Sequence, residues 1–556
     1  MDDDKLLTIR MKRLRLYFAI LFALTCVCHE SSSQDVYKNK RSVWLEKAAA
    51  TQPSLVSFEN RPLSLVTIIK DDNSFQGYKV SERKSVDSFY VNSMKRQSGA
   101  ILDFGEHLTG FVTFKIEDLK AVADAALRLK FTFAEVPAEA VLPFDPYKGG
   151  LSRAWLQDEV ITVSEVPSTI TIPRRVAFRY VKIEVLGSST YSDFKISDIS
   201  IKATSSARQQ PAALANGTSE LIRKIDQVGL STLKECMQTV YEDGPKRDRR
   251  LWIGDLYLES LANRYSFKND SLTKHCLYLL AGLSYPGGVA PSNVFERPAP
   301  HAQNNPLFDY ALIYNTVLKE YLIETRDKET ANDLWEVAKV QVQIPKKYIG
   351  EDGMIDYELA GKEWWVFFDW KEGLDKQASL QGCVIWAFKN TYELAKMLGK
   401  EKEVAELPGL AEKMIKAAHK NLYDSKQGLF LSGKNKQISY ASQAWMVLSG
   451  VATKTEGAKA FKNLLQKTDV VYPGAPYLYH YVVEAMIMTG LHEEARNIIT
   501  TYWGGMVKKG ADTFWEVYDP TNDYISPYNS FLVNSYCHAW SCTPVYFIRK
   551  YPEIFQ

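Results

Sequence analysis

The chain has 556 residues and a formal net charge of +2, so its overall charge attracts neither nucleic acid nor an anionic membrane. Hydrophobic residues make up 46% and charged residues 24%, a composition typical of folded globular proteins and not of disordered ones. A chain of this length forms two or three cores, so we expect several domains and no nucleic-acid partner.

The first 34 residues have the pattern of an export signal. The segment 12–15, which holds three basic residues, precedes an apolar run at 16–27, and polar residues follow this run. About a dozen apolar residues are too few for a permanent membrane-spanning helix. We therefore expect an exported protein, periplasmic, attached to the outer membrane or extracellular in a bacterium. Cys26 or Cys28 is a candidate for a lipid anchor to a membrane, although the residues before Cys26 fit a lipidation signal poorly.

Residues 35–205 are predicted to form an antiparallel β-sandwich domain. Between about residues 86 and 203, segments such as 110–116, 127–133 and 181–185 alternate apolar and polar side chains. This alternation is typical of strands that bury one face. Residues 36–85 are expected to add lead-in or edge strands.

Residues 206–556 are predicted to form an (α/α)6 barrel. Apolar residues now recur at steps of three and four, as in amphipathic helices, and Gly399 and Gly490 stand where helices would end. About a dozen such segments follow, and six helical hairpins would close into a barrel whose funnel is lined by loops at one end. The loops rich in reactive residues are 242–255, 285–305, 352–377 and 509–528.

No cofactor or metal is expected from the sequence. It contains no glycine-rich phosphate loop, no His-Glu-x-x-His motif and no nucleophile elbow. Five cysteines remain after the export segment, and their wide spacing resembles neither a disulfide nor a zinc framework.

Carboxyl groups and aromatic side chains cluster at two distant places. The segment 243–255 holds three carboxylates, four cations and one tryptophan, and Trp515-Glu516 puts a further acid beside an aromatic ring. Two separated carboxyl groups suit glycosidic-bond hydrolysis, because one protonates the leaving oxygen while the other activates water or attacks carbon. Taken alone, the first cluster is also compatible with an ion-pair network that braces its loop.

The first cluster resembles the signature of the α-L-rhamnosidases of glycoside hydrolase family 78. Asp243, Arg247 and Trp252-Ile253-Gly254-Asp255 match that signature, and the resemblance continues at 368–370, 510–516 and 534–540. It covers roughly residues 100–550. It implies a β domain before a six-hairpin barrel, and an inverting exo-glycosidase that removes a terminal α-L-rhamnosyl or closely related sugar.

The resemblance also implies a role for each matched residue. Glu516 would be the general base and Asp248 the general acid. The side chains implied to bind the sugar are those of Asp243, Arg247, Trp252, Asp255, Asp369, Trp370, Trp515 and His538. A common form of the family motif is one residue longer and has glutamate as the acid, so this position falls on Asp248 or on Arg249. Only Asp248 can donate a proton at neutral pH, and Glu242 and Glu296 are the reserve candidates.

Two other functions stay open at this point, each with a carbohydrate partner. The arginine-rich loop would also bind a carboxylate, as in an α/α-barrel hydrolase or lyase that acts on a uronic acid. If Arg249 occupies the position of the acid, the barrel would bind glycan without turnover. The exact sugar, its linkage, and the choice between monomer and dimer stay open as well.

Overall fold

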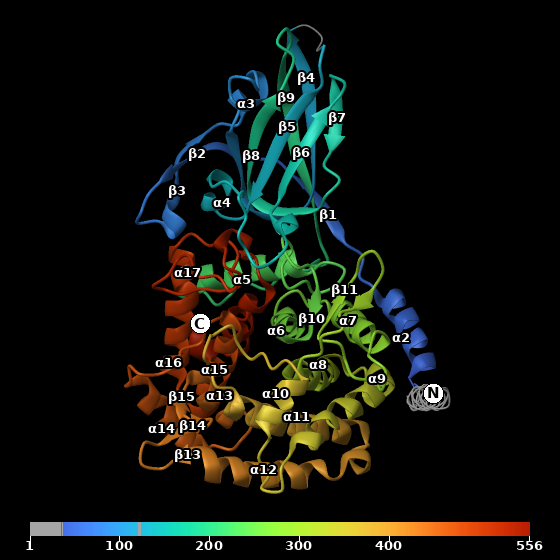
Figure 1. Cartoon of the computed structure of the whole chain (residues 1–556), viewed down its shortest axis with the longest axis vertical. Helices are drawn as coiled ribbons and strands as arrows, with labels where there is room; N and C mark the ends of the chain where they lie inside the picture. Colours follow the sequence, from blue (N-terminus) through green and yellow to red (C-terminus); the bar gives the residue numbers. More distant parts are fainter. Residues whose placement is uncertain (1–34, 36, 121–123) are drawn as a thin grey trace, which may run out of the picture.

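The structure is a computed structural model that describes residues 35, 37–120 and 124–556. It has a β domain at one end of the molecule and a helical domain at the other (Figure 1). The expected export signal and the two candidate lipid-anchor cysteines lie outside the described residues. In the described part of the chain, none of the helices has the length and apolar character needed to cross a membrane.

The β domain is built from one antiparallel sheet. Its main strand order is β1 (Val56–Asn60), β9 (Asp193–Ser205), β4 (Ala100–Lys120), β8 (Val176–Gly187), β5 (Leu127–Ala134) and β6 (Asp158–Val163). Strands β2 (Ser64–Lys70), β3 (Tyr78–Lys84) and β7 (Ser168–Thr171) branch from this path, with β2 and β7 both paired with β4. The short helices of this domain are α3 (Asp87–Val91) and α4 (Pro137–Val141).

The sheet folds back on itself into two packed layers, and the long strand β4 belongs to both of them. Its residues 100–103 and 108–110 pair with β8, with a register shift between Asp103 and Leu108, and its residues 110–120 pair with β9. The apolar side chains of the two layers meet in one core, where the ring of Phe114 in β4 lies 4.8 Å from that of Phe131 in β5. The predicted antiparallel β domain is therefore confirmed, with one strand common to both layers.

The residues before the sheet form a helix instead of the expected lead-in strand. Helix α2 (Lys38–Thr51) lies against α7 (Asp270–Gly282) on the outside of the helical domain (Figure 1). Trp44 and Ala48, one helical turn apart, are buried in the core of that domain. The expectation of strands is thus wrong for residues 38–51, and the sheet begins at Val56 and not near residue 35.

The helical domain is a barrel of helical hairpins, as predicted. Successive inner helices contact one another, namely α6 (Ile253–Arg264), α8 (Phe308–Thr325), α11 (Gln377–Leu398), α13 (Tyr440–Leu448) and α15 (Pro476–Thr489). The turn Ala539–Cys542 and α18 (Pro544–Lys550) close the ring back onto α6. The outer layer contains α5 (Glu220–Cys236), α7, α9 (Lys328–Gln341), α12 (Leu407–Leu422), α14 (Lys454–Leu465), α16 (His492–Ile498) and α17 (Gly504–Lys508).

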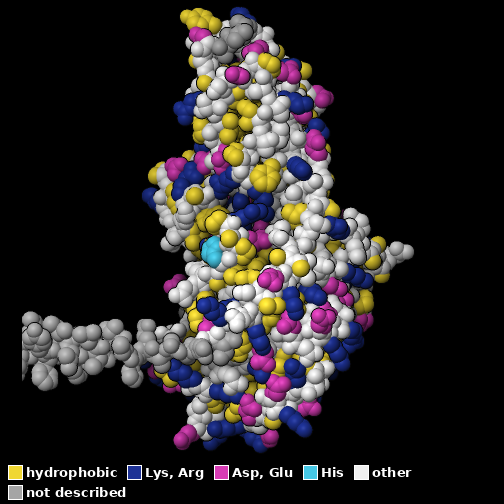
Figure 2. Space-filling view, turned by 90° about the vertical axis from the view of Figure 1, so that its right-hand side faces the viewer, with side chains coloured by type: hydrophobic (Ala, Val, Ile, Leu, Met, Phe, Trp, Pro, Cys, Tyr) yellow, Lys and Arg dark blue, Asp and Glu magenta, His cyan; other side chains and the backbone are white. Residues whose placement is uncertain are grey.

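Short elements complete this domain. They are β10 (Leu251–Trp252), β11 (Asn293–Phe295), β12 (His301–Ala302), α10 (Tyr357–Glu363), β13 (Tyr423–Asp424), β14 (Leu429–Ser432), β15 (Gln437–Ile438) and α19 (Pro552–Phe555). Helices α11 and α15 end at Gly399 and Gly490 in the left-handed conformation, with φ of 70° and 83°, as the sequence predicts. On the face drawn in Figure 2, cationic and anionic side chains are intermixed, in keeping with the small net charge.

Candidate active site

A cavity of about 170 Å³ brings together most of the predicted site residues. It is lined by Leu151, Asp243, Arg247, Asp248, Trp252, Asp255, Leu307, Tyr310, Trp365, Phe367, Trp370, Glu516, Tyr528, His538 and Trp540. The two predicted catalytic carboxyl groups, Asp248 and Glu516, therefore lie in one cavity although they are far apart in the sequence.

The loop after α5 is shaped by tight packing at its start. A side chain at Gly244 would collide with the carbonyl of Arg247 and the hydroxyl of Ser535, so only glycine fits there. The loop ends in β10, which pairs with β11, and α6 begins directly after it. The predicted loop 285–305 thus supports the site through β11 and does not line the cavity.

The guanidinium group of Arg247 links the two predicted catalytic carboxyl groups, those of Asp248 and Glu516. Its Nη2 donates to Oε2 of Glu516, and its Nη1 lies 3.5 Å from Oδ1 of Asp248. Its Nε donates to the carbonyl of Val533 at 2.9 Å, and the Tyr528 ring lies 4.4 Å from the guanidinium carbon. Because Arg247 is only 2% exposed, these contacts fix its position.

The environment of Glu516 suits a general base. Burial raises its pKa, but the positive charge of Arg247, the neighbouring His538 and a hydrogen bond from the Tyr528 hydroxyl outweigh burial and hold the pKa below its usual value. Glu516 is therefore a carboxylate at neutral pH and can accept a proton from water.

Asp243 organises the loop around the proposed acid. Its two carboxyl oxygens accept hydrogen bonds from the backbone N–H groups of Asp248 at 3.3 Å and Arg250 at 3.0 Å. Burial, together with the charges of Asp248 and Asp255, raises the pKa of Asp243 to about 8. The Asp248 side chain is more open, with 14% exposure, and lies 3.5 Å from Nη1 of Arg250.

His538 faces the carboxylates of Asp255 and Glu516. Its Nε2 lies 3.4 Å from Oδ1 of Asp255, and neither ring nitrogen makes a hydrogen bond to any other described residue. Burial lowers the pKa of His538, but the charges of Glu516 and Asp255 raise it above the usual value. The imidazole lies against Trp540, with ring centres 4.3 Å apart, so it is held in place and available to a sugar hydroxyl.

Two predicted sugar-binding residues do not line the cavity. Asp369 is buried behind Trp370, where its Oδ2 accepts from the N–H of Gly474 at 2.6 Å, and burial raises its pKa to about 7. Trp515 points toward the β domain and stacks on Phe75, with ring centres 4.0 Å apart. The prediction that these two side chains contact the sugar is corrected accordingly, and Asp369 instead supports the loop that carries Trp370.

Neither reserve candidate for the acid lies in the cavity. Both carboxylate oxygens of Glu242 accept from Nη2 of Arg175 at 2.7 Å, which ties this residue to the β domain. Glu296 accepts from the hydroxyl of Thr239 at 2.6 Å. Their carboxyl groups are thus occupied in contacts outside the site.

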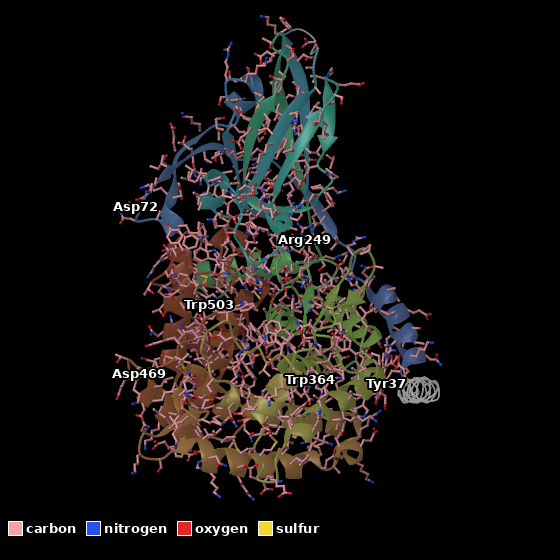
Figure 3. All side chains as sticks on the ribbon, in the orientation of Figure 1. Tyr37, Asp72, Arg249, Trp364, Asp469 and Trp503 are labelled. Carbon is pink, nitrogen blue, oxygen red and sulfur yellow. The ribbon has the colours of Figure 1, made fainter. Side chains whose placement is uncertain are left out.

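Arg249 turns away from the cavity. It has a φ of 62°, which directs its side chain to the boundary between the two domains (Figure 3). There Nε donates to the carbonyl of Pro245 and Nη2 to that of Arg175, each at 2.8 Å. The side chain of Asp248, and not that of Arg249, therefore faces the cavity.

Several lining residues were not predicted. Trp365 and Phe367 belong to the aromatic run 364–370, and Tyr528 ends a loop already marked as rich in reactive residues, so local signals existed for these three. Leu151 gave no such signal, because it belongs to the β domain and reaches the cavity only through the packing of the two domains. Among the described residues, no group of three or more His, Cys, Asp or Glu side chains is arranged to hold a metal ion.

Two models of known protein families match this chain. Residues 62–203 match the family model described as the glycosyl hydrolase family 78 alpha-rhamnosidase N-terminal domain. Residues 213–551 match the bacterial alpha-L-rhamnosidase six-hairpin glycosidase domain. No curated protein matches the chain in sequence.

Solved structures show the same similarity. A rhamnosidase from Klebsiella oxytoca with rhamnose bound has a TM-score of 0.88 and 37% identity, over 92% of this chain and 99% of that one. A family 78 rhamnosidase of Bacillus sp. GL1 has a TM-score of 0.70 and 20% identity, over 85% of this chain and 50% of that one. The Streptomyces avermitilis alpha-L-rhamnosidase complexed with L-rhamnose has a TM-score of 0.64 and 13% identity, over 90% and 44% of the two chains.

Proposed function

The chain belongs to the α-L-rhamnosidases of glycoside hydrolase family 78, and we propose that it releases terminal α-L-rhamnosyl residues from glycans or glycosides with inversion. The observation that carries this proposal is the contact of Asp248 and Glu516 with one guanidinium group, that of Arg247, in a small cavity. A cavity of about 170 Å³ suits one sugar unit, which favours cleavage at the end of a glycan.

In the proposed reaction, Asp248 and Glu516 act on opposite sides of the anomeric carbon. Asp248 protonates the glycosidic oxygen as the bond from the anomeric carbon to that oxygen breaks. Glu516 takes a proton from a water molecule, whose oxygen forms the new bond to the anomeric carbon. The first products are β-L-rhamnose and the free alcohol, and the proton held by Glu516 then restores Asp248 through solvent.

The other cavity residues would bind and orient the sugar. Asp243, Asp255 and His538 offer donors and acceptors to its hydroxyl groups, while Trp252 and Trp370 offer aromatic faces. Support for rhamnose comes from the Klebsiella oxytoca rhamnosidase, which has rhamnose bound.

Two observations disfavour the alternative functions. The guanidinium of Arg247 is already engaged by Glu516, by Asp248 and by a backbone carbonyl, so it is not free to bind the carboxylate of a uronic acid. The position of Arg249 outside the cavity removes the reason for expecting a barrel that binds glycan without turnover.

The proposal is tested with Asp248→Asn and Glu516→Gln on an aryl α-L-rhamnoside. Each variant should lose about 10²- to 10⁴-fold in kcat, which is the usual contribution of a general acid or base. Rhamnose binding, measured by calorimetry, should remain. Proton NMR of the wild-type reaction should show β-L-rhamnose as the first anomer. Wild-type rates for Asp248→Asn would disprove the acid assignment, and α-L-rhamnose appearing first would disprove inversion.

We also propose that the protein is exported, on the basis of the basic, apolar and polar segments within residues 12–34. Expression of the whole chain in a Gram-negative host, followed by fractionation and mass spectrometry, tests this. We expect a product in the periplasm or membrane fraction that lacks the first 25 to 35 residues or so. An uncleaved cytoplasmic product would contradict export, and a lipid-modified Cys26 or Cys28 would identify an anchor.

A further inference from the structure

A second, larger cavity adjoins the catalytic one. It has a volume of about 620 Å³, against about 170 Å³ for the catalytic cavity, and Trp370 lines both. Its walls come from residues 370–372, 472–474, 517–521 and 525–527, together with Tyr479 of the inner helix α15 and Tyr502, which precedes α17. We call this cavity the aromatic groove. Its position makes Trp370 the partition between the groove and the proposed rhamnose site.

The aromatic groove has the character of a carbohydrate surface. Tyr472 is 46% exposed at its rim and is backed by the ring of Tyr440 at 5.1 Å. Deeper in the groove, the rings of Tyr479 and Tyr502 lie 4.1 Å apart, and the Tyr502 hydroxyl donates to the carbonyl of Tyr518 at 2.9 Å. The groove thus combines fixed aromatic faces with one ring that is open to solvent, and pyranose C–H groups pack well on such faces.

Charged side chains of both signs and a hydroxyl group line the same groove. Lys371, Glu372, Asp519 and Thr521 stand among its lining residues. Hydroxyl-rich ligands need donors and acceptors beside an apolar face, whereas a purely aromatic ligand needs only the face. The lining therefore favours neutral sugar units over an aromatic aglycone.

A hydrogen bond fixes the loop that carries Trp370. Asp369 accepts from the N–H of Gly474, which joins the loop that carries Trp370 to the loop that carries Tyr472. The indole Nε1 of Trp370 is buried and makes no hydrogen bond to any other described residue. Because Nε1 has almost no accessible surface, Trp370 contributes its ring, and not this donor, to the walls of the two cavities.

We propose that the aromatic groove binds the pyranose units next to the terminal rhamnosyl group, so that the preferred substrate is a rhamnosyl-terminated oligosaccharide. The proposal deepens the proposed function and rests on it, because the rhamnosyl group must occupy the adjoining cavity. The volume of the groove, more than three times that of the catalytic cavity, provides room for more than one further unit.

The test compares two substrates in the full-length enzyme carrying Tyr472→Ala. One is an aryl α-L-rhamnoside and the other is a rhamnosyl-terminated tetrasaccharide of neutral hexoses. For the tetrasaccharide we expect kcat/KM to fall by about 3- to 10-fold through a higher KM, since one aromatic face for stacking is lost. For the aryl rhamnoside we expect no change.

Two matched variants serve as controls. Tyr472→Phe keeps the aromatic face and should retain activity on the tetrasaccharide. Tyr191→Ala removes a 74% exposed tyrosine of the β domain, far from the groove in the sequence, and should change neither substrate. Equal effects of Tyr472→Ala on both substrates would overturn the proposal, because the ring would then act on the catalytic cavity or on folding.

Failure of the proposed function has a different signature. A wild-type enzyme that does not cleave the aryl rhamnoside would contradict rhamnosidase activity. The groove can still be examined by saturation-transfer NMR, with the trisaccharide that remains when the rhamnosyl group is removed from the tetrasaccharide. A signal that is lost in Tyr472→Ala supports the groove. Absence of a signal in the wild type would overturn it.

Discussion

At the scale of single residues, Arg247 determines the ionisation of the proposed base. Its guanidinium is the nearest positive charge to Glu516 and counteracts burial, which on its own would raise the pKa of that carboxyl group. A base must be ionised, so the acidic limb of the pH profile of kcat/KM should report Glu516, with kcat/KM falling as the pH drops through the pKa of this group.

We expect Arg247→Gln to move this acidic limb to higher pH by about one to two units, because removal of a nearby positive charge raises the pKa of a buried carboxylate. At neutral pH the rate should fall as well. The measurement is the pH profile of kcat/KM on an aryl α-L-rhamnoside. Arg247→Lys keeps the charge and should shift the limb less, and circular dichroism shows whether each variant is folded. An acidic limb that stays in place in a folded Arg247→Gln would refute the electrostatic role.

At the scale of elements, the hairpin of β2 and β3 supports the segment that carries Glu516, the proposed base. Its tip, the turn Phe75–Gly77, reaches the helical domain near α17 (Figure 1). Phe75 stacks on Trp515, the residue directly before Glu516, and the side-chain amide of Gln76 donates to the hydroxyl of Tyr536. Through this hairpin the β domain therefore contributes to the position of Glu516, although neither Phe75 nor Gln76 lines the catalytic cavity.

Removal of this contact should affect both stability and turnover. We expect Phe75→Ala to lower the free energy of unfolding by about 2 kcal/mol, less than for a fully buried phenylalanine because Phe75 is only partly buried. Loss of alignment at Glu516 should lower kcat by about 10- to 100-fold with a smaller change in KM. Thermal denaturation and steady-state kinetics measure the two effects, with Phe75→Tyr as the control. A destabilised variant with wild-type kcat would show that the hairpin only stabilises the fold.

Elements whose ends are marked by particular residues in the sequence were predicted better than elements whose burial depends on packing against distant parts of the chain. The ends of α11 and α15 followed from Gly399 and Gly490, because a left-handed residue at a helix end favours glycine wherever the helix packs. Helix α2 was missed, because its burial depends on α7, more than 200 residues away, and the few apolar residues around Trp44 gave little sign of it.

At the scale of the whole molecule, a buried cluster of charges joins the two domains. Lys246, which directly precedes Arg247, is 2% exposed and lies 2.8 Å from Glu135 and 2.6 Å from Glu139 of the β domain. His107 of β4 adds a contact of 3.0 Å to Glu135. In the sequence these residues look like ordinary surface charges, so this interface could not be predicted, although the acidic and basic residues of the site itself could be recognised from their motif.

This cluster predicts a pH-dependent effect of Lys246→Met. Burial and the charge of Glu135 raise the pKa of Glu139 to about 7 even though Lys246 opposes the shift, so loss of the lysine leaves Glu139 without a cation and Glu135 with His107 alone. At pH 8 we expect the variant to lose about 3–5 kcal/mol of unfolding free energy, the usual cost of breaking a buried ion pair. At pH 5 Glu139 binds a proton and no longer needs a cation, so the loss should be clearly smaller. Urea denaturation at the two pH values measures the difference.

The control for this experiment is Lys246→Arg, which keeps the charge between the two domains and should be destabilised little at either pH. Lys246 directly precedes Arg247 in the loop 242–255. Lys246→Met should therefore also lower kcat for an aryl rhamnoside, and the decrease relative to the wild type should be larger at pH 8 than at pH 5. If Lys246→Met lost the same stability at both pH values, the unpaired carboxyl group of Glu139 would not be the cause. The domain contact would then depend on packing, and the catalytic loop would not depend on these charges for its position.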